Sequence, residues 1–360
     1  MKLLRQHMMK IRGFSLVELM VALTIGLIIL SSVSMLFVSS KKTYTTQDRL
    51  ARLQENARFA MHFIIKDLRV AGYYGCIDDI NADSVNNTLN NSTSFAYDAQ
   101  IPLEGLNNAT GTWYPSGSAT LPSGIASGTD AIAIRMADTN SPAYLDQEMP
   151  NTSAVLKLNT FTDPVSNTPY FNDGDIIMVS DCTSADIMQV TQVNTTDPHL
   201  VHNSGAGSPG NSTQMLSKAY SPSGNGTRVM KFMTRQYFIA TGASGNPALW
   251  RQDNAATPVE LVDGIESLQV LYGKDTDSDR MPNVYLKAGA AGLQSTSDWS
   301  SVVSVRIGIL ARTVNDKDTD IDYRTYDVDG DGNIDFTPPS NPPDRNMRRI
   351  FQAAVQLRNL

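Results

Sequence analysis

The sequence predicts an α+β fold in which a long amino-terminal helix packs across one face of a mostly antiparallel β-sheet head. Three observations lead to this fold class: an apolar run over residues 14–38, an amphipathic pattern that continues it to about residue 71, and strand patterns in the rest of the chain. With 360 residues, the chain is long enough for one large head in addition to the helix.

The first part of the expected helix is apolar on every side. Residues 14–38 read FSLVELMVALTIGLIILSSVSMLFV and carry one formal charge, Glu18. A run of this length, at about 1.5 Å per residue, is long enough to cross a bilayer. Lys2, Arg5, Lys10 and Arg12 precede it, and such a basic flank stays in the cytoplasm, so we expect the head to face outward.

Glu18 separates two interpretations of this segment. An ordinary secretory signal peptide also has a basic start and an apolar core. A carboxylate inside the apolar run costs a few kcal/mol in lipid, however, so its presence indicates a partner or a function for Glu18.

The second part of the expected helix is amphipathic. Apolar residues recur every three or four positions and would form one stripe against a head: Leu50, Leu53, Ala57, Met61, Ile64 and Leu68. We expect one continuous helix from Phe14 to about Ala71, about 85 Å long at 1.5 Å per residue. Gly72 and Gly75 mark its end.

The remainder of the chain predicts loops and short strands. Residues 77–130 are rich in Asn, Ser, Thr and Gly with little periodicity, which is typical of long loops. Strand patterns follow at residues 130–136, 175–180, 187–193, 236–240, 248–252, 268–272, 303–310 and 351–358. The second and third of these segments predict one hairpin, and the fourth and fifth predict another. We expect the chain to end on a half-buried strand.

The two cysteines, Cys76 and Cys182, lie in the part that we expect to be exported. An even number of cysteines in an exported chain favours a structural disulfide over two free thiols. The bridge would close a loop of about a hundred residues and stabilise the fold by on the order of 4 to 5 kcal/mol in the chain-entropy model. It would connect the end of the helix to the middle of the head.

The start of the chain resembles a known export signal. The string GFSLVELMVAL, preceded by a basic leader, is similar to the class III signal of type IV prepilins and type II secretion pseudopilins. The resemblance implies that a prepilin peptidase cuts after Gly13, that the new terminal Phe14 is N-methylated, and that Glu18 is the intramembrane carboxylate used in assembly. The positive terminus of a neighbouring subunit would neutralise Glu18 in low dielectric, and the alternative is a plain signal peptide or anchor.

A weaker resemblance lies near the other end. Residues 261–275, 301–312 and 348–359 look like stretches of PilW-type minor pilins. This implies a low-abundance structural subunit, not an enzyme, that primes a type IV pilus or sits at its tip and supports twitching motility, adhesion or DNA uptake. Two alternatives remain: a J-like minor pseudopilin of a type II secretion system, and a membrane-anchored exported hydrolase.

The resemblance also implies domains, partners and location. The domains would be a leader (residues 1–13), a transmembrane and assembly half-helix (14–38), an amphipathic half-helix (39–72) and an exported β-rich head (73–360). Expected partners are other major and minor pilins, the prepilin peptidase, the inner-membrane assembly platform and a tip adhesin. The subunit would sit in the bacterial inner membrane, with its head in the periplasm, before it enters the extracellular pilus.

One segment of the head has the pattern of a calcium loop. It places oxygen-bearing side chains at alternate positions, with Gly332 at the sharp turn: Asp327, Asp329, Asp331, Asn333 and Asp335. The twelfth position is Pro338, so the bidentate Glu is missing and a further ligand would have to come from elsewhere. The segment therefore predicts either a Ca²⁺ site or a solvated Asp/Gly turn.

A second segment starts in the same way. Asp275, Asp277 and Asp279 alternate, but Arg280 stands where glycine is wanted and adds a cation beside the carboxylates. It is the weaker candidate for Ca²⁺.

Other chemistry finds little support in the sequence. His199 and His202 could bind a metal, but a pair in a polar loop is more often solvated, and no phosphate-binding loop or nucleophile elbow is present. The chain has 36 acidic and 29 basic side chains, so a basic surface for nucleic acid is not expected. Arg348 and Arg349 are expected to form a solvated or salt-bridged edge.

Overall fold

The computed structural model describes residues 15–77, 84–109, 111–118, 120–160, 162, 168–222, 226–314, 321–343 and 345–359. The chain forms two compact units, Met1–Arg52 and Leu53–Leu360. The boundary between the units lies inside the long helix.

A single long helix, α1 (Leu16–Leu68), begins directly after Ser15. In the second unit it buries one stripe of side chains: Leu53, Ala57, Ala60, Met61, Ile64 and Leu68. This stripe contains the predicted positions except Leu50, which is half-buried. The amphipathic interpretation is therefore confirmed.

The chain leaves α1 through two glycines. Gly72 and Gly75 have φ of +70° and +86°, a backbone conformation that glycine adopts without a steric cost. The N–H of Gly72 donates to the carbonyl of Arg135, at 2.9 Å, so the end of the helix is tied to a strand of the head. The helix ends slightly before the predicted residue, Ala71, because the chain must turn to make this contact.

In the described residues the head contains sixteen strands and one short helix. The strands are β1 (Val85–Asn87), β2 (Leu103–Leu106), β3 (Trp113–Tyr114), β4 (Ala131–Ala137), β5 (Leu156–Lys157), β6 (Ile176–Ser180), β7 (Ala185–Gln189), β8 (Gln192–Asn194), β9 (His199–Val201), β10 (Arg228–Thr241), β11 (Pro247–Asp253), β12 (Val259–Asp263), β13 (Ile265–Lys274), β14 (Val284–Leu286), β15 (Val302–Arg312) and β16 (Arg348–Gln356). The helix is α2 (Thr296–Trp299).

The strands form three sheets. The largest has the order β1-β7-β6-β10-β4-β2-β3, with β11 and β12 added on β10. The second has the order β14-β13-β15-β16, and a small third sheet has the order β5-β9-β8. Among the described strand pairs only β1 with β7 is parallel, so the predicted mostly antiparallel head is confirmed.

Both predicted hairpins are present, β6 with β7 and β10 with β11. Strand β10 has 14 residues and starts well before the predicted residue 236. It is long because it pairs with β4, β6 and β11 in turn, and β4 and β6 are distant in sequence. The terminal strand β16 alternates between exposed and partly buried residues along most of its length, as predicted.

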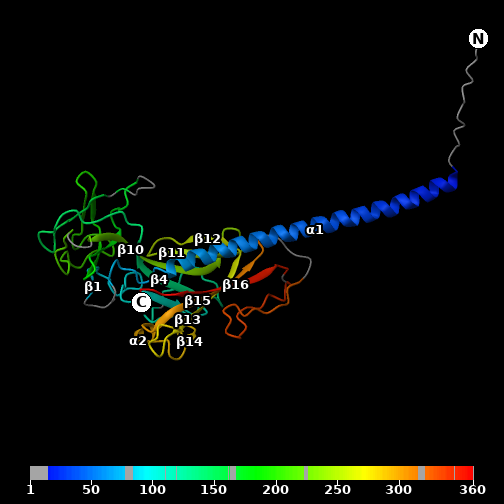
Figure 1. Ribbon diagram of the computed structural model, residues 1–360. Helices are drawn as coiled ribbons and strands as arrows, with labels where there is room; N and C mark the ends of the chain where they lie inside the picture. The colour runs from blue at the N-terminus through cyan, green and yellow to red at the C-terminus, as the bar shows by residue number, and fades with distance from the viewer. Residues whose placement is uncertain are drawn as a thin grey trace, which may run out of the picture. The chain divides into compact units, whose positions relative to one another are not determined.

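The main hydrophobic core lies between α1 and the two larger sheets. It combines the buried stripe of the helix with apolar residues of β4, β10, β11, β13, β15 and β16. A second core lies within residues 143–229 and has no helix. Figure 1 shows the last strand, β16, in red beside β15 at the edge of its sheet.

The segment that follows β15 returns over that strand. Val328 and Tyr326 form a small cluster with Leu310 of β15. A side chain at Gly308 would overlap the carbonyl oxygen of Val328, so only glycine permits this close approach. The packing brings residues 327–335 onto the second sheet.

The expectation of a solvated or salt-bridged edge at the paired arginines is correct only in part. Arg349 is exposed, but Arg348 is fully buried. Its guanidinium pairs with Glu266, at 2.5 Å, and with Asp322, at 3.1 Å. A buried guanidinium needs such partners, so Arg348 joins β16, β13 and the segment after β15 from the inside.

Candidate functional site

Two regions contain the predicted site residues: the start of α1 and the aspartate-rich loops of the head. At the start of α1, the Ser15 N–H donates to the Glu18 carboxylate at 2.8 Å, and the Ser15 hydroxyl accepts from Val17 N–H at 3.3 Å. Together the two bonds cap the start of the helix: Glu18 reaches back to the N-cap N–H as in a capping box, and the Ser15 hydroxyl accepts from the second helical residue. The signature Ser-x-x-Glu is visible in the sequence but was not used in the prediction. Glu18 therefore has a partner within its own chain.

Gly13 and Phe14, the predicted cleavage and methylation residues, lie outside the described residues. Cleavage after Gly13 would leave the Ser15–Glu18 pair within the mature chain, because both residues follow the cut.

The apolar run behind Glu18 is exposed throughout. Within the described residues α1 is the one helix long and apolar enough to cross a membrane, and its most apolar window is 0% buried. Leu16, Met35 and Phe37 are each at least 70% exposed. So much apolar surface requires a lipid or protein environment.

The predicted disulfide is confirmed. Cys76 and Cys182 are bonded, with their Cα atoms 4.5 Å apart and 106 positions apart in sequence. Cys182 lies in the turn between β6 and β7, so the bridge connects the segment after α1 to this hairpin.

The loop 327–335 folds so that its carboxylates accept hydrogen bonds from its own backbone. Asp327 accepts from the N–H groups of Gly330, at 2.7 Å, and Gly332, at 2.9 Å. Asp329 accepts from the N–H of Asp331 at 3.0 Å. Both glycines have positive φ, +76° and +93°, which allows these tight turns.

Three of the five predicted calcium ligands converge. Oxygen atoms of Asp327, Asp329 and Asp335 lie within 4.8 Å of one another. Asp331 lies outside this group of three, and its carboxylate accepts the Asn333 N–H at 2.7 Å. Asp329 is buried with 0% of its surface exposed.

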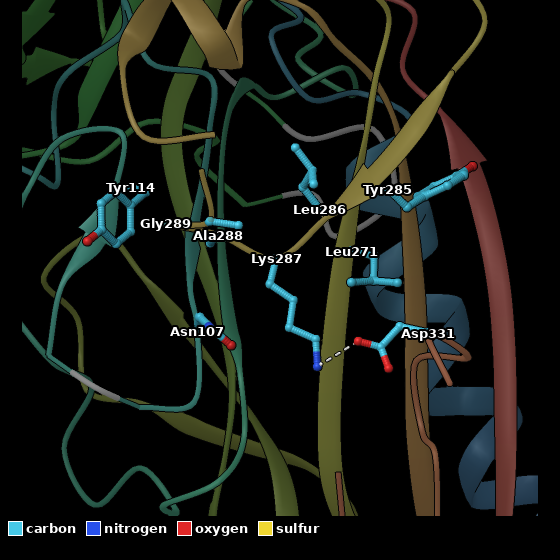
Figure 2. A pocket seen from close by; sticks show the side chains of 10 residues that line it. Asn107, Tyr114, Leu271, Tyr285, Leu286, Lys287, Ala288, Gly289 and Asp331 are labelled. Atoms are coloured by element: carbon cyan, nitrogen blue, oxygen red, sulfur yellow. Dashed lines mark ion pairs between the residues drawn. The ribbon is translucent and has the colours of Figure 1, made fainter. Parts of the chain in front are cut away.

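Lys287, which the sequence did not suggest, supplies the charge that opposes these carboxylates. It directly follows β14, and its ammonium lies 3.0 Å from Asp329, 3.2 Å from Asp331 and 3.1 Å from Asp335. Figure 2 shows Lys287 pointing toward Asp331 along the wall of a pocket. The pocket has a volume of about 440 Å³, and Tyr114 and Tyr285 also line it.

The contact between Lys287 and the loop affects the pKa values of the groups on both sides. Burial by itself would lower the pKa of Lys287, but hydrogen bonds and charge from Asp329 and Asp335 outweigh it and hold that pKa well above its usual range. Burial raises the pKa of Asp329 despite the contact with Lys287. The pKa of the less buried Asp331 is lowered, because hydrogen bonds from Asn333 and Lys287 exceed the opposing effect of burial.

Carboxylate oxygens are the ligands that Ca²⁺ prefers, so the donor chemistry of the loop suits this ion. The arrangement does not suit it, because the Lys287 ammonium already contacts Asp329, Asp331 and Asp335. A divalent ion at these carboxylates would be repelled by the ammonium, because the two cations would lie close together. Calcium binding remains a prediction from the sequence.

The weaker candidate, residues 275–279, is built differently. Oxygen atoms of Asp275, Asp277 and Asp279 also lie within 4.8 Å of one another, but Asp277 and Asp279 are exposed. Asp275 accepts from the N–H groups of Ser278, at 2.7 Å, and Arg280, at 2.8 Å. Desolvation opposes these bonds, yet together with others from the same turn they lower the pKa of Asp275.

The histidine pair is not the solvated pair that was expected. His202 is 3% exposed, and its ring nitrogen pairs with the carbonyl of Ala154 at 2.9 Å. Burial lowers the pKa of His202, which favours the neutral ring. His199 lies 3.4 Å from Asp197. The two rings have separate partners in the described structure.

Comparison with known protein families gives two matches. Residues 8–34 match the prokaryotic N-terminal methylation motif, the region that contains Gly13, Phe14 and Glu18. The motif includes the exposed apolar start of α1, and this helix continues into the β-rich head, an arrangement consistent with prepilin-like proteins.

Residues 236–359 match type IV pilus-assembly protein W, PilW, over a stretch that includes both aspartate-rich turns and Lys287. Together, the two matches support a type IV pilus PilW-like pilin. No curated protein and no solved structure was found to match the chain.

Proposed function

We propose that this chain is a low-abundance pilin that primes assembly of a type IV pilus or sits at its tip. The observation that carries the proposal is the exposure of the whole apolar start of α1, on a chain whose later part matches a pilus-assembly family. The role is structural, as expected for this family, and supports pilus biogenesis, with twitching motility, adhesion or DNA uptake as its outputs.

The exposed helix needs two environments in turn. Before assembly, lipid covers residues 16–38, with the head on the periplasmic side. During assembly, the helices of other pilins replace the lipid. The prepilin peptidase and the inner-membrane assembly platform act on the subunit at the membrane, and major and minor pilins and a tip adhesin are its neighbours in the pilus.

Low abundance follows from the size of the head. A head of nearly 290 residues, 73–360, repeated at every position would crowd its neighbours along a filament. One copy, or a few, at the end of a filament avoids this crowding.

Glu18 is the residue through which assembly can be tested. Its bond to the Ser15 N–H caps the start of its own helix, and we propose that its charge also pairs with the methylated amino terminus of a neighbouring subunit. A glutamine can still accept the Ser15 N–H but carries no charge. Glu18→Gln therefore separates the cap from the charge.

Filaments would be sheared from cells, and the subunit quantified by mass spectrometry in the filament and membrane fractions. Glu18→Gln and Glu18→Ala should both reduce incorporation by at least about tenfold, because an unpaired buried amine costs more than 1.4 kcal/mol. Glu55→Gln, an exposed carboxylate further along α1, is the matched control and should behave as wild type.

Normal incorporation of Glu18→Gln beside a loss in Glu18→Ala would reduce Glu18 to a helix cap. The same spectra test processing: the mature chain should begin at N-methylated Phe14, and a start near Ser34 would contradict the pilin interpretation.

A J-like pseudopilin of a type II secretion system is the second candidate, since it would share the same leader. The match of residues 236–359 to a pilus-assembly family favours the pilus. Deleting the gene should abolish surface pili and leave secretion of exported enzymes intact; the opposite result would favour the pseudopilin.

A further inference from the structure

We propose that the Lys287 ammonium is the resident cation of the loop 327–335 and takes the position that a divalent ion takes in loops of this sequence. The inference concerns the head alone and does not depend on the role of the subunit in a filament.

The ammonium lies among three carboxylates of the loop. Asp329, Asp331 and Asp335 all lie within 3.2 Å of it. Lys287 donates a hydrogen bond to Asp335, at 3.1 Å, and forms ion pairs with Asp329 and Asp331. Asp335 also accepts from the Val328 N–H, at 2.7 Å, so the loop closes around the ammonium.

Asp329 is the carboxylate that most needs this cation. It is fully buried, and its Oδ2 atom lies 3.0 Å from the Lys287 ammonium as an ion pair but accepts no hydrogen bond among the described residues. An ionised carboxylate without a counter-charge is strongly disfavoured inside a protein. Lys287 is the cation within reach.

Both sides of the contact are held in place by backbone packing. On one side, Gln352 of β16 donates to the carbonyl of Val328 at 2.9 Å, and Gly308 admits the same carbonyl onto β15. On the other side, Lys287 directly follows β14, which pairs with β13. Packing therefore fixes the backbone on both sides of the contact.

The loop also lacks what a calcium site would add. The twelfth position is Pro338, so the bidentate carboxylate that completes such sites is missing. The Lys287 ammonium occupies the position of the ion, so a carboxylate at the twelfth position is not required. Lys287 thus determines which cation the loop accepts.

The test uses the full-length chain in detergent. Its three tryptophans, Trp113, Trp250 and Trp299, all lie in the head, so melting followed by tryptophan fluorescence reports the head. Wild type, Lys287→Met, Asp329→Asn and the double variant would be melted in a chelator and in millimolar CaCl₂. Asp277→Asn, in the exposed turn, is the matched control.

In the chelator, Lys287→Met should lower the melting temperature by about 5 °C or more, because it leaves a buried carboxylate unpaired. The double variant should melt at or above Lys287→Met, since removing the charge of Asp329 removes the penalty. If each substitution only removed packing, the decreases in melting temperature of the two single variants would add in the double variant.

Calcium should leave wild type and Asp277→Asn unchanged and raise the melting temperature of Lys287→Met, whose loop has lost its cation. Calorimetric titration of wild type with CaCl₂ should give no binding heat that depends on Asp329, and it stays informative if Lys287→Met fails to fold. Calcium binding to wild type that Asp329→Asn abolishes would overturn the proposal, as would a Lys287→Met protein that melts like wild type.

Discussion

The two aspartate-rich turns of the head begin with the same alternation of carboxylates and end in different environments. In residues 275–279 the side chains of Asp277 and Asp279 are exposed, and backbone N–H groups of the same turn satisfy Asp275. In residues 327–335 the same type of local bonding is present, but Asp329 is buried and faces Lys287.

The difference shows what an alternating aspartate pattern does by itself. It folds a turn, because each carboxylate can accept the N–H groups that follow it. It does not by itself bury the carboxylates. Burial makes the negative charge costly, and it comes from the strands beneath the turn.

The largest expected effect on stability comes from disrupting the contact between the buried turn, residues 327–335, and β15. Gly308→Ala would overlap the carbonyl of Val328, which is backbone and cannot rotate away. We expect a loss of about 3 kcal/mol in unfolding free energy, the upper range for overpacking, measured by urea denaturation.

The matched change in the exposed turn is Asp277→Ala, which should alter stability by no more than about 0.5 kcal/mol. Equal stability of Gly308→Ala and wild type would mean that the buried turn does not depend on its contact with β15.

A smaller effect concerns pH. Asp130 accepts from the N–H groups of Asn108, at 2.7 Å, and Val270, at 2.8 Å, yet burial outweighs these bonds and raises its pKa from 3.8 to about 7. A raised pKa in the folded state means that the contribution of Asp130 to stability is present below pH 3.8 and is lost as the pH rises through about 7.

The melting temperature of wild type relative to Asp130→Asn should therefore fall between these two pH values. Asp275 of the exposed turn has a lowered pKa, so its contribution is lost only as the pH falls below the ordinary range of a carboxyl group. A constant difference between wild type and Asp130→Asn across the range would show that Asp130 does not titrate there.

The smallest expected effect comes from completing the pattern of the exposed turn. Arg280 has φ of +64°, a conformation that glycine adopts freely, and its N–H would still reach Asp275 after substitution. Arg280→Gly should stabilise the head by about 0.5 kcal/mol at most, since relief of strain is partly offset by entropy in the unfolded chain.

In Arg280→Gly the exposed turn would read Asp-x-Asp-x-Asp-Gly, which is the pattern of a calcium loop, without being buried. We expect no calcium-dependent shift in its melting temperature. A shift would mean that the sequence pattern, and not burial, determines cation binding.

Much of the fold follows from local sequence. The apolar stripe from Leu53 to Leu68, both hairpins and the terminal strand were predictable, because each depends on a period of 3.6 or 2 within one segment. The length of β10 was not predictable, since its first residues are held by β6 and β4. The burial of Arg348 also depends on a distant residue, Glu266.

The candidate sites also divide into those that local sequence or residue counts predict and those that depend on distant residues. The helix cap between Ser15 and Glu18 is a local signal, and Cys76 and Cys182 could be paired because the chain has two cysteines. No sequence pattern pointed to Lys287, because it is a single lysine 40 or more residues before the loop that it contacts.

The membrane-length helix, the export-signal motif, the disulfide and the two aspartate-rich turns could all be predicted from the sequence, because each needs only nearby residues or a count of residue types. The burial of one turn against β15, and its contact with Lys287, could be seen only in the folded chain. The physical reason is that the cost of a charge depends on its surroundings, and the surroundings of Asp329 are assembled from strands that lie far apart in the chain.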